Sequence, residues 1–81
     1  MPKITLDDQG HGQTLTLEPS EVINYAQDTI QLLKNEANDP SEQRLYQKCQ
    51  AILDSPKLSI DQQLPTAFDI LEIANVYPKE D

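Results

Sequence analysis

The chain has 81 residues, of which 37% are hydrophobic and 5% aromatic, and it carries a formal net charge of −8 at pH 7. This length predicts one domain with a thin core of aliphatic side chains. The negative charge repels phosphate backbones and anionic lipid surfaces, so we expect no direct binding to nucleic acid. The acidity permits a basic partner, but it also simply keeps a small domain soluble.

One cysteine excludes an internal disulfide, and no apolar run approaches the roughly 20 residues that a membrane span requires. The N-terminus also lacks the basic and apolar regions of a signal peptide. We therefore expect a cytoplasmic protein without membrane insertion.

Residues 1–17 predict a short β-hairpin, because two segments alternate apolar and polar side chains. The apolar side chains share one face when Leu6 pairs with Leu15 and Ile4 with Leu17. This register leaves residues 9–12, which include both glycines, as the turn. A lone hairpin is marginal in water, so its apolar face must pack on other elements.

Two helices are predicted next, over residues 19–37 and 40–54. Pro19 suits the first position of a helix, and acidic side chains in the first turn face the positive end of its dipole. The first helix has an apolar stripe at helical spacing, consisting of Val22, Ala26, Ile30, Leu33 and Ala37. Asp39 is predicted to be the N-cap of the second helix, and Pro40 suits its first turn.

A third helix is predicted over residues 60–77, where Ser59 and Gln62 resemble a capping box. Pro65 lacks a backbone N–H, so we expect one turn from Ile60 to Leu64, a kink, and a further helix from Pro65 to Tyr77. Residues 78–81 form a tail. The predicted fold is a mainly α single domain over residues 1–81. It is an antiparallel bundle of three helices, or four if the kink divides the last, with an N-terminal β-hairpin.

The glycine-containing turn raises the question of a metal site, since five residues fall at the spacing of an EF-hand calcium loop and three of the five match its residue types. The five residues are Asp7, Gln9, His11, Gly12 and Glu18. Gln9 and His11 are the wrong ligand types, and a strand precedes the loop where a helix is needed. His11 with Asp7 and Asp8 is also a weak set for a transition metal. We therefore expect a turn and no metal.

Catalytic motifs are weak throughout the chain. Cys49 is far in sequence from His11, the one histidine, and is expected to be a small buried apolar residue. Asp69 and Glu72 lie one helical turn apart, as an acid/base pair does, but without a partnering His or Arg they are expected to form a solvated face. We therefore expect neither an enzyme nor a cofactor.

Charge is unevenly distributed along the last helix, because residues 59–76 carry three acidic side chains and no Lys or Arg. Such a face predicts a recognition surface, and it is equally explained by plain exposure to solvent. The candidate partner-binding residues are Asp61, Thr66, Asp69, Glu72 and Tyr77.

The segment from Leu32 to Tyr77 contains "LYQ" at residues 45–47 and "LPTAFDILEIANVY" at residues 64–77. It resembles the enterocin A-type immunity proteins of class II bacteriocins. The resemblance implies an antiparallel four-helix bundle in the cytosol of the producer cell, which engages the bacteriocin-bound sugar-transporter receptor in the membrane without catalysis. It also implies that the late helix, residues 65–77, is the recognition end.

Together these observations predict a non-catalytic protein-binding domain, of which a bacteriocin immunity protein is the sharpest version. The alternative is an acidic inhibitor or antitoxin-like protein that occupies a basic site on a nucleic-acid-binding protein. The oligomeric state is open at this point.

Overall fold

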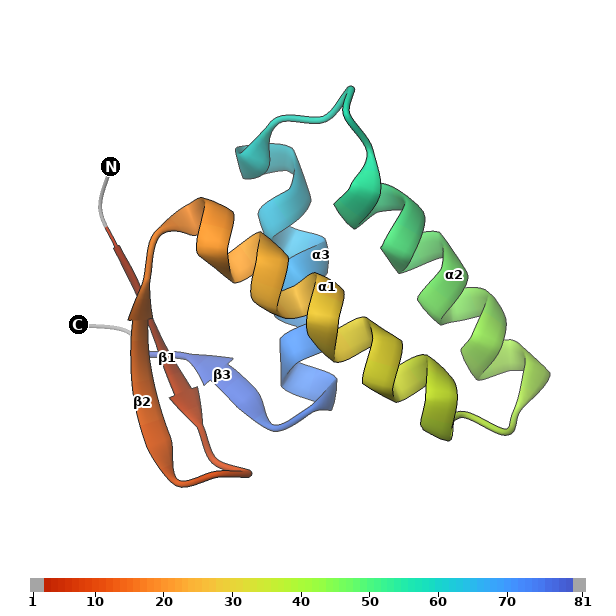
Figure 1. Cartoon of the computed structure of the whole chain (residues 1–81), viewed down its shortest axis with the longest axis horizontal. Helices are drawn as coiled ribbons and strands as arrows, with labels where there is room; N and C mark the ends of the chain where they lie inside the picture. Colours follow the sequence, from red (N-terminus) through yellow and green to blue (C-terminus); the bar gives the residue numbers. More distant parts are fainter. Residues whose placement is uncertain (1–2, 80–81) are drawn as a thin grey trace.

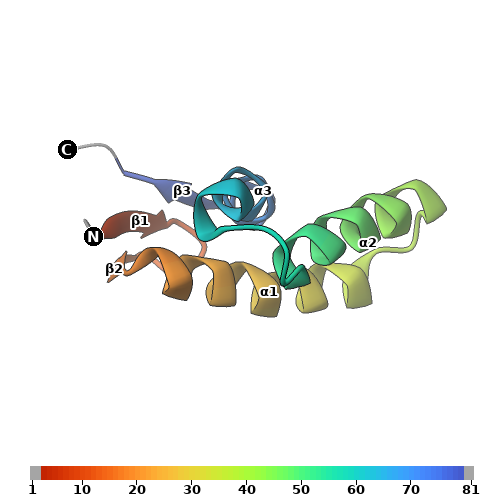
Figure 2. The ribbon, with the colours of Figure 1, turned by 90° about the horizontal axis from the view of Figure 1, so that it is seen from above.

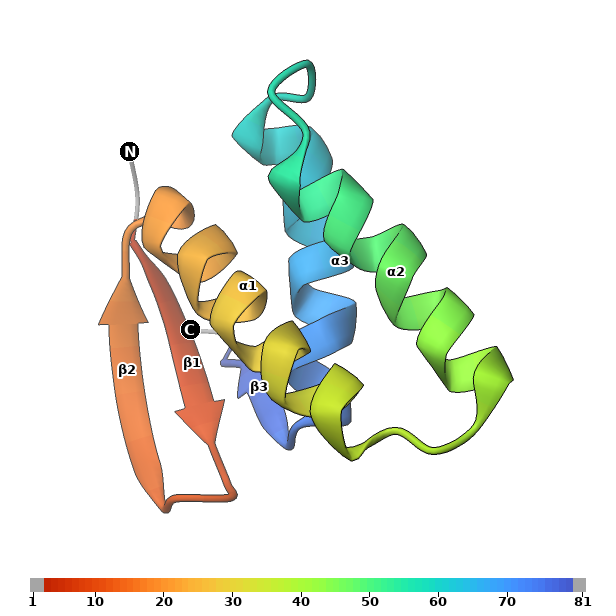
Figure 3. The same cartoon turned by 45° about the vertical axis from the view of Figure 1, so that its right-hand side comes forward.

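The computed structural model describes residues 3–79. The elements in chain order are β1 (Ile4–Asp8), β2 (Gln13–Leu17), α1 (Pro19–Glu36), α2 (Pro40–Asp54), α3 (Ile60–Ile73) and β3 (Val76–Pro78). The strands form one antiparallel sheet in the order β2-β1-β3. α1 and α3 pack next to this sheet, and α2 packs on α1 and α3 on the side away from it (Figures 1, 2 and 3).

The predicted hairpin is confirmed in its register. Ile4 pairs with Leu17 and Leu6 with Leu15, and residues 9–12 form the turn. Gly12 in this turn has a φ of 64°, a conformation that glycine adopts without a steric penalty. Leu6, at the centre of the sheet, has none of its surface exposed and belongs to the core that the hairpin shares with the helices.

The helices begin at the predicted residues. Glu18 and Glu21 form a reciprocal capping box at the start of α1, and Ser59 with Gln62 forms another at the start of α3. At the start of α2, the Asp39 side chain accepts the N–H of Ser41 at 2.9 Å. α2 has the predicted bounds, whereas α1 ends at Glu36, one residue before the predicted end.

Side-chain amides donate to carbonyls at the C-terminal ends of the first two helices, where the regular helical hydrogen bonds run out. The Gln43 side chain donates to the carbonyls of Lys34 and Ala37, both at 2.8 Å, at the end of α1. The buried Gln63 side chain of α3 donates to three carbonyls at the end of α2, those of Ile52, Leu53 and Ser55. These bonds tie each helix to the one that follows it.

The prediction of two helical pieces separated at Pro65 is wrong. α3 is one helix from Ile60 to Ile73 with Pro65 inside it. Pro65 lies in the second turn, so the hydrogen bond that it cannot make is the one to the carbonyl of Asp61. Asp61 and Pro65 are both exposed, so water can reach this carbonyl and the helix continues.

The prediction of helix as far as Tyr77 is also wrong. α3 ends at Ile73, and Asn75 has a φ of 63°, a left-handed conformation that asparagine tolerates better than most residues. The chain then turns back, and Val76 pairs with Asp8 and Pro78 with Leu6 in an antiparallel β3. The sheet is therefore built from both ends of the described chain, rather than from an N-terminal hairpin alone.

Residues 78–81 were expected to be a tail. Pro78 instead belongs to β3, the Lys79 N–H donates to the Thr5 carbonyl at 2.8 Å, and residues 80–81 lie outside the described part. The described residues form three helices and a three-stranded sheet, which differs from the four-helix bundle that the family resemblance implies.

We expect Leu6→Ala to lower the free energy of unfolding by about 2–5 kcal/mol, because the fully buried side chain leaves a cavity between the sheet and the helices. Leu32→Ala is the matched control. The Leu32 side chain is 65% exposed, so its loss should change the free energy by less than about 0.5 kcal/mol. Urea unfolding followed by circular dichroism measures both, and equal effects would contradict this description of the core.

Candidate functional site

Four of the five residues predicted to bind a partner lie on α3, and the fifth, Tyr77, lies in β3. Asp61, Asp69 and Glu72 are exposed on α3, and Thr66 is half-buried on the same helix. Tyr77 lies in β3, where it pairs with Asp7. Its neighbour Val76 is buried toward the helices, and successive strand residues point to opposite faces, so Tyr77 points to the sheet face that bears no helix.

The turn of the hairpin is held by a buried carboxylate. Asp8, the last residue of β1, is only 1% exposed. Its Oδ1 accepts the backbone N–H of His11 at 3.2 Å, and its Oδ2 lies 2.9 Å from Nδ1 of the His11 ring. Oδ2 also accepts bonds from Nε2 of Gln13 at 3.3 Å and from the hydroxyl of Tyr25 at 3.2 Å. This carboxylate therefore connects β1, the turn, β2 and α1.

These contacts shift the pKa values of Asp8 and Tyr25. Burial alone would raise the pKa of Asp8, but the hydrogen bonds from His11 and Gln13 outweigh it and lower the pKa from its ordinary value of 3.8. Burial raises the pKa of Tyr25 above its ordinary value of 10.0, and the charge of Asp8 and the hydrogen bond to it raise it further. At neutral pH Asp8 is a carboxylate and Tyr25 a neutral phenol that donates to it.

Within the described residues, the hydrogen bonds of the His11 ring go to Asp8 alone, and the His11 side chain is 77% exposed. Since a carboxylate only accepts hydrogen bonds, Nδ1 of the ring is the donor. The hydrogen bonds between His11 and Asp8 fasten the turn.

The turn interpretation of the glycine-containing segment is confirmed by the strand pairing on either side of it. Asp7 and Asp8 are successive strand residues and point to opposite faces of the sheet, while Glu18 follows the far end of β2 as the N-cap of α1. Among residues 3–79, no three His, Cys, Asp or Glu side chains lie together in a group that could hold a metal ion.

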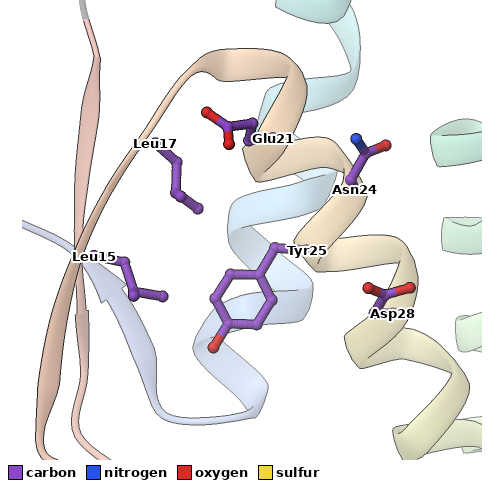
Figure 4. Close-up of a pocket in the computed structure, with 6 residues that line it drawn as sticks. All are labelled: Leu15, Leu17, Glu21, Asn24, Tyr25 and Asp28. Carbon is purple, nitrogen blue, oxygen red and sulfur yellow. The ribbon is translucent and has the colours of Figure 1, made fainter.

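An open pocket of about 330 Å³ lies between β2 and α1, and we call it the β2–α1 pocket. Its lining residues are Leu15, Leu17, Glu21, Asn24, Tyr25 and Asp28. Figure 4 shows the two leucines of β2 directed toward α1, with the ring of Tyr25 beside them. The carboxylates of Glu21 and Asp28 lie at opposite ends of the pocket on α1, so an apolar floor has acidic groups at its rim.

Within residues 3–79, the outer edge of β2 presents backbone groups that no other strand pairs with, next to this pocket. The Lys79 N–H binds the Thr5 carbonyl, so the backbone of Thr5 faces β3 and points away from β2. Thr16 is the register partner of Thr5 and must likewise point its N–H and C=O away from β1. The same holds for Thr14, the partner of Asp7, two residues along. Both threonines are exposed, and β2 has β1 as its one neighbour in the sheet of the described chain.

The opposite edge of the sheet is blunted. β3 has only 3 residues, and Pro78 pairs with Leu6, whose backbone faces β2. Pro78 therefore occupies an outward-facing backbone position, and it has no N–H to offer there. Proline and short length are two means by which sheet edges avoid pairing with other chains. β2 has five residues and no proline, so neither feature protects its edge.

The sequence pattern indicated some of the residues that line this pocket. The alternation of Leu15 and Leu17 placed them on the apolar face of the hairpin, and Tyr25 lies three residues after Val22, on the buried side of α1. The predicted hairpin has two free edges, and the sequence did not show which of them stays free, because that depends on β3 pairing with β1.

Comparisons with known proteins find no relative: neither a protein-family model, nor a curated protein, nor a solved structure matches this chain. Among residues 3–79, none of the helices has the length and apolar character needed to cross a membrane.

Cys49 lies on α2, half-buried and packed against the core. Burial raises the pKa of its thiol, and the negative charge of Asp69 raises it further. Both effects disfavour the thiolate, which is the reactive form.

We expect Asp8→Asn to lower the melting temperature at pH 7, because the amide group turns an N–H₂ toward donors from His11, Gln13 and Tyr25. Asp7→Asn, which makes the same charge change on the other face of β1, is the control and should have a smaller effect. Thermal unfolding followed by circular dichroism measures both variants, and similar losses would contradict the fastening role of Asp8.

The Asp8→Asn variant also tests how the stability that Asp8 contributes depends on pH. Because the folded pKa of Asp8 is lowered, its contribution to stability is complete above the unfolded pKa near 3.8 and is lost as the pH falls through the folded pKa. The stability difference between the wild type and Asp8→Asn should therefore shrink in acid. Urea midpoints from pH 7 to pH 2 measure this difference, and a constant gap would disprove it.

We expect the Cys49 thiol to react with iodoacetamide more slowly in the folded protein than in urea, because its raised pKa and partial burial lower the amount of accessible thiolate. Mass spectrometry follows the alkylation at pH 8. Asp69→Asn should increase the folded rate slightly. Equal rates in the folded and unfolded protein would contradict this assignment.

Proposed function

We propose that the protein is a non-catalytic protein-binding domain that binds an extended segment of its partner along the β2 edge. The observation that carries this proposal is the combination of unpaired backbone groups at Thr14 and Thr16 with the apolar β2–α1 pocket beside them. Strand addition uses such an edge for affinity and the neighbouring pocket for specificity.

The geometry of an added strand is set by the sheet. It would lie about 4.8 Å from β2 and exchange hydrogen bonds with the outward N–H and C=O groups of Thr14 and Thr16. Its alternate side chains would point to the same face as Leu15 and Leu17, which is the face covered by α1. Those side chains would therefore meet the pocket, while the others would lie beside the threonines on the open face.

Bacteriocin immunity, with a sugar-transporter receptor in the membrane as the partner, stays a prediction that rests on the resemblance over residues 32–77. Cytoplasmic localisation likewise stays a prediction. The proposed binding at the β2 edge depends on neither.

A second candidate function is the acidic inhibitor or antitoxin-like protein, which would occupy a basic site on a nucleic-acid-binding protein. It is supported by the exposed carboxylates of Asp61, Asp69 and Glu72 on α3. Binding through these side chains would weaken steeply with salt, since screening removes its main attraction. Binding through backbone hydrogen bonds and an apolar pocket would be less sensitive to salt.

We expect Thr16→Pro to weaken partner binding at least about tenfold, because the proline removes an outward N–H and its ring obstructs an incoming strand. The β1–β2 hydrogen bonds do not use this N–H, so the hairpin should remain folded. Thr16→Val is the matched control, since it keeps the N–H and the branched side chain.

The measurement is affinity capture from a lysate of the native host, with detergent-solubilised membranes included, by the wild type and both variants. A protein that is retained by the wild type and Thr16→Val but lost with Thr16→Pro supports strand addition. A partner retained by Thr16→Pro but lost when Asp61, Asp69 and Glu72 are neutralised favours the acidic inhibitor instead.

A further inference from the structure

We propose that the segment bound at the β2 edge is basic, and that the β2–α1 pocket receives one of its Lys or Arg side chains. This proposal rests on the proposed function. It adds the chemistry of the partner, which the free edge alone does not specify because backbone hydrogen bonds are the same for every sequence.

The pocket matches a side chain that is apolar along its length and cationic at its end. Leu15, Leu17 and Tyr25 supply an apolar floor for the methylene groups, which Lys and Arg bury readily. The face of an aromatic ring such as that of Tyr25 also attracts cations.

The rim of the pocket supplies the opposite charge. Glu21 and Asp28 are seven residues apart on α1, which places them about 10 Å apart along the helix, one at each end of the pocket. Among the described residues, those that line the pocket include no Lys or Arg. A cationic group in the pocket would reach either carboxylate, whereas an acidic side chain would be repelled by both.

The charge of the whole chain argues against a second copy as the occupant. Two copies pairing edge to edge would bring two acidic rims together, and each copy carries a formal net charge of −8. The negative charge of the chain attracts a basic segment and raises its rate of association.

The partner's pattern follows from the alternation of an added strand. Side chains on the α1 side would be Lys or Arg, and those between them would lie beside Thr14 and Thr16, where threonine or valine pairs well across strands. The expected ligand is therefore a short extended segment with basic residues at alternate positions.

The test uses three capped synthetic peptides in which threonine alternates with lysine, with norleucine or with glutamate. Norleucine keeps the apolar chain and lacks the charge. Titration followed by amide NMR signals of the full chain should show binding of the lysine peptide, with shifts concentrated in residues 13–17 and 21–28. The glutamate peptide should not bind, and the norleucine peptide should bind several-fold more weakly than the lysine peptide.

Two double variants test whether the carboxylates at the pocket rim, and not those of α3, attract the lysine peptide. Glu21→Gln with Asp28→Asn should weaken binding of the lysine peptide about three- to tenfold. Gln at position 21 can still accept the Glu18 N–H, which Glu21 now accepts at 2.9 Å, so the cap of α1 is kept. Asp69→Asn with Glu72→Gln removes the same charge from α3 and should leave the affinity unchanged.

The outcomes separate the two proposals. If the norleucine peptide binds as tightly as the lysine peptide, and Thr16→Pro weakens both, strand addition holds and the basic chemistry is overturned. If Thr16→Pro binds the lysine peptide as well as the wild type does, or if the shifts fall on α3, both proposals fail. Self-association in sedimentation experiments that Thr16→Pro abolishes would make a second copy the occupant and overturn the basic-segment proposal.

Discussion

The buried carboxylate of Asp8 is the constraint on which the rest of the structure depends. A carboxylate that is 1% exposed is costly unless donors surround it, and the turn, β2 and α1 each supply one through His11, Gln13 and Tyr25. A shift of register by one residue would turn Asp8 to the opposite face, away from these donors. The same interaction that closes the turn therefore sets how β2 lies against α1.

Tyr25 links this fastening to the candidate site. Its hydroxyl donates to Asp8 at 3.2 Å, and its ring forms part of the floor of the β2–α1 pocket. The Tyr25 hydroxyl is protonated throughout the neutral range, so its hydrogen bond to Asp8 holds the ring in place beside the pocket. The pocket is a consequence of how the hairpin is anchored, and a change at Asp8 is expected to alter binding as well as stability.

Local signals in the sequence predicted much of this fold. Strand alternation set the register of Leu6 with Leu15, and Asp39 and Ser59 marked helix starts correctly, because these features depend on near neighbours in the chain. The wrong prediction of helix beyond Ile73 concerns residues whose conformation depends on distant contacts. Tyr77 fits the helical spacing of Ile70 and Ile73, which predicted helix as far as Tyr77. In the structure, pairing with β1 makes Val76 and Tyr77 part of a strand instead. The burial of Asp8, and with it the role of the turn, depends on Tyr25, 17 residues away.

The two edges of the sheet are treated differently, and this difference connects the fold to the proposed function. Pro78 and the shortness of β3 protect one edge, whereas Thr14 and Thr16 leave the other open. An open edge invites pairing with any extended chain, including another copy. The acidic rim of Glu21 and Asp28 opposes pairing between copies through like charge and favours a segment that brings its own cations. Charge would thus supply the selectivity that backbone hydrogen bonds lack. Neutralising Glu21 and Asp28 is therefore expected to weaken the binding of basic ligands and, at the same time, to make pairing between copies easier.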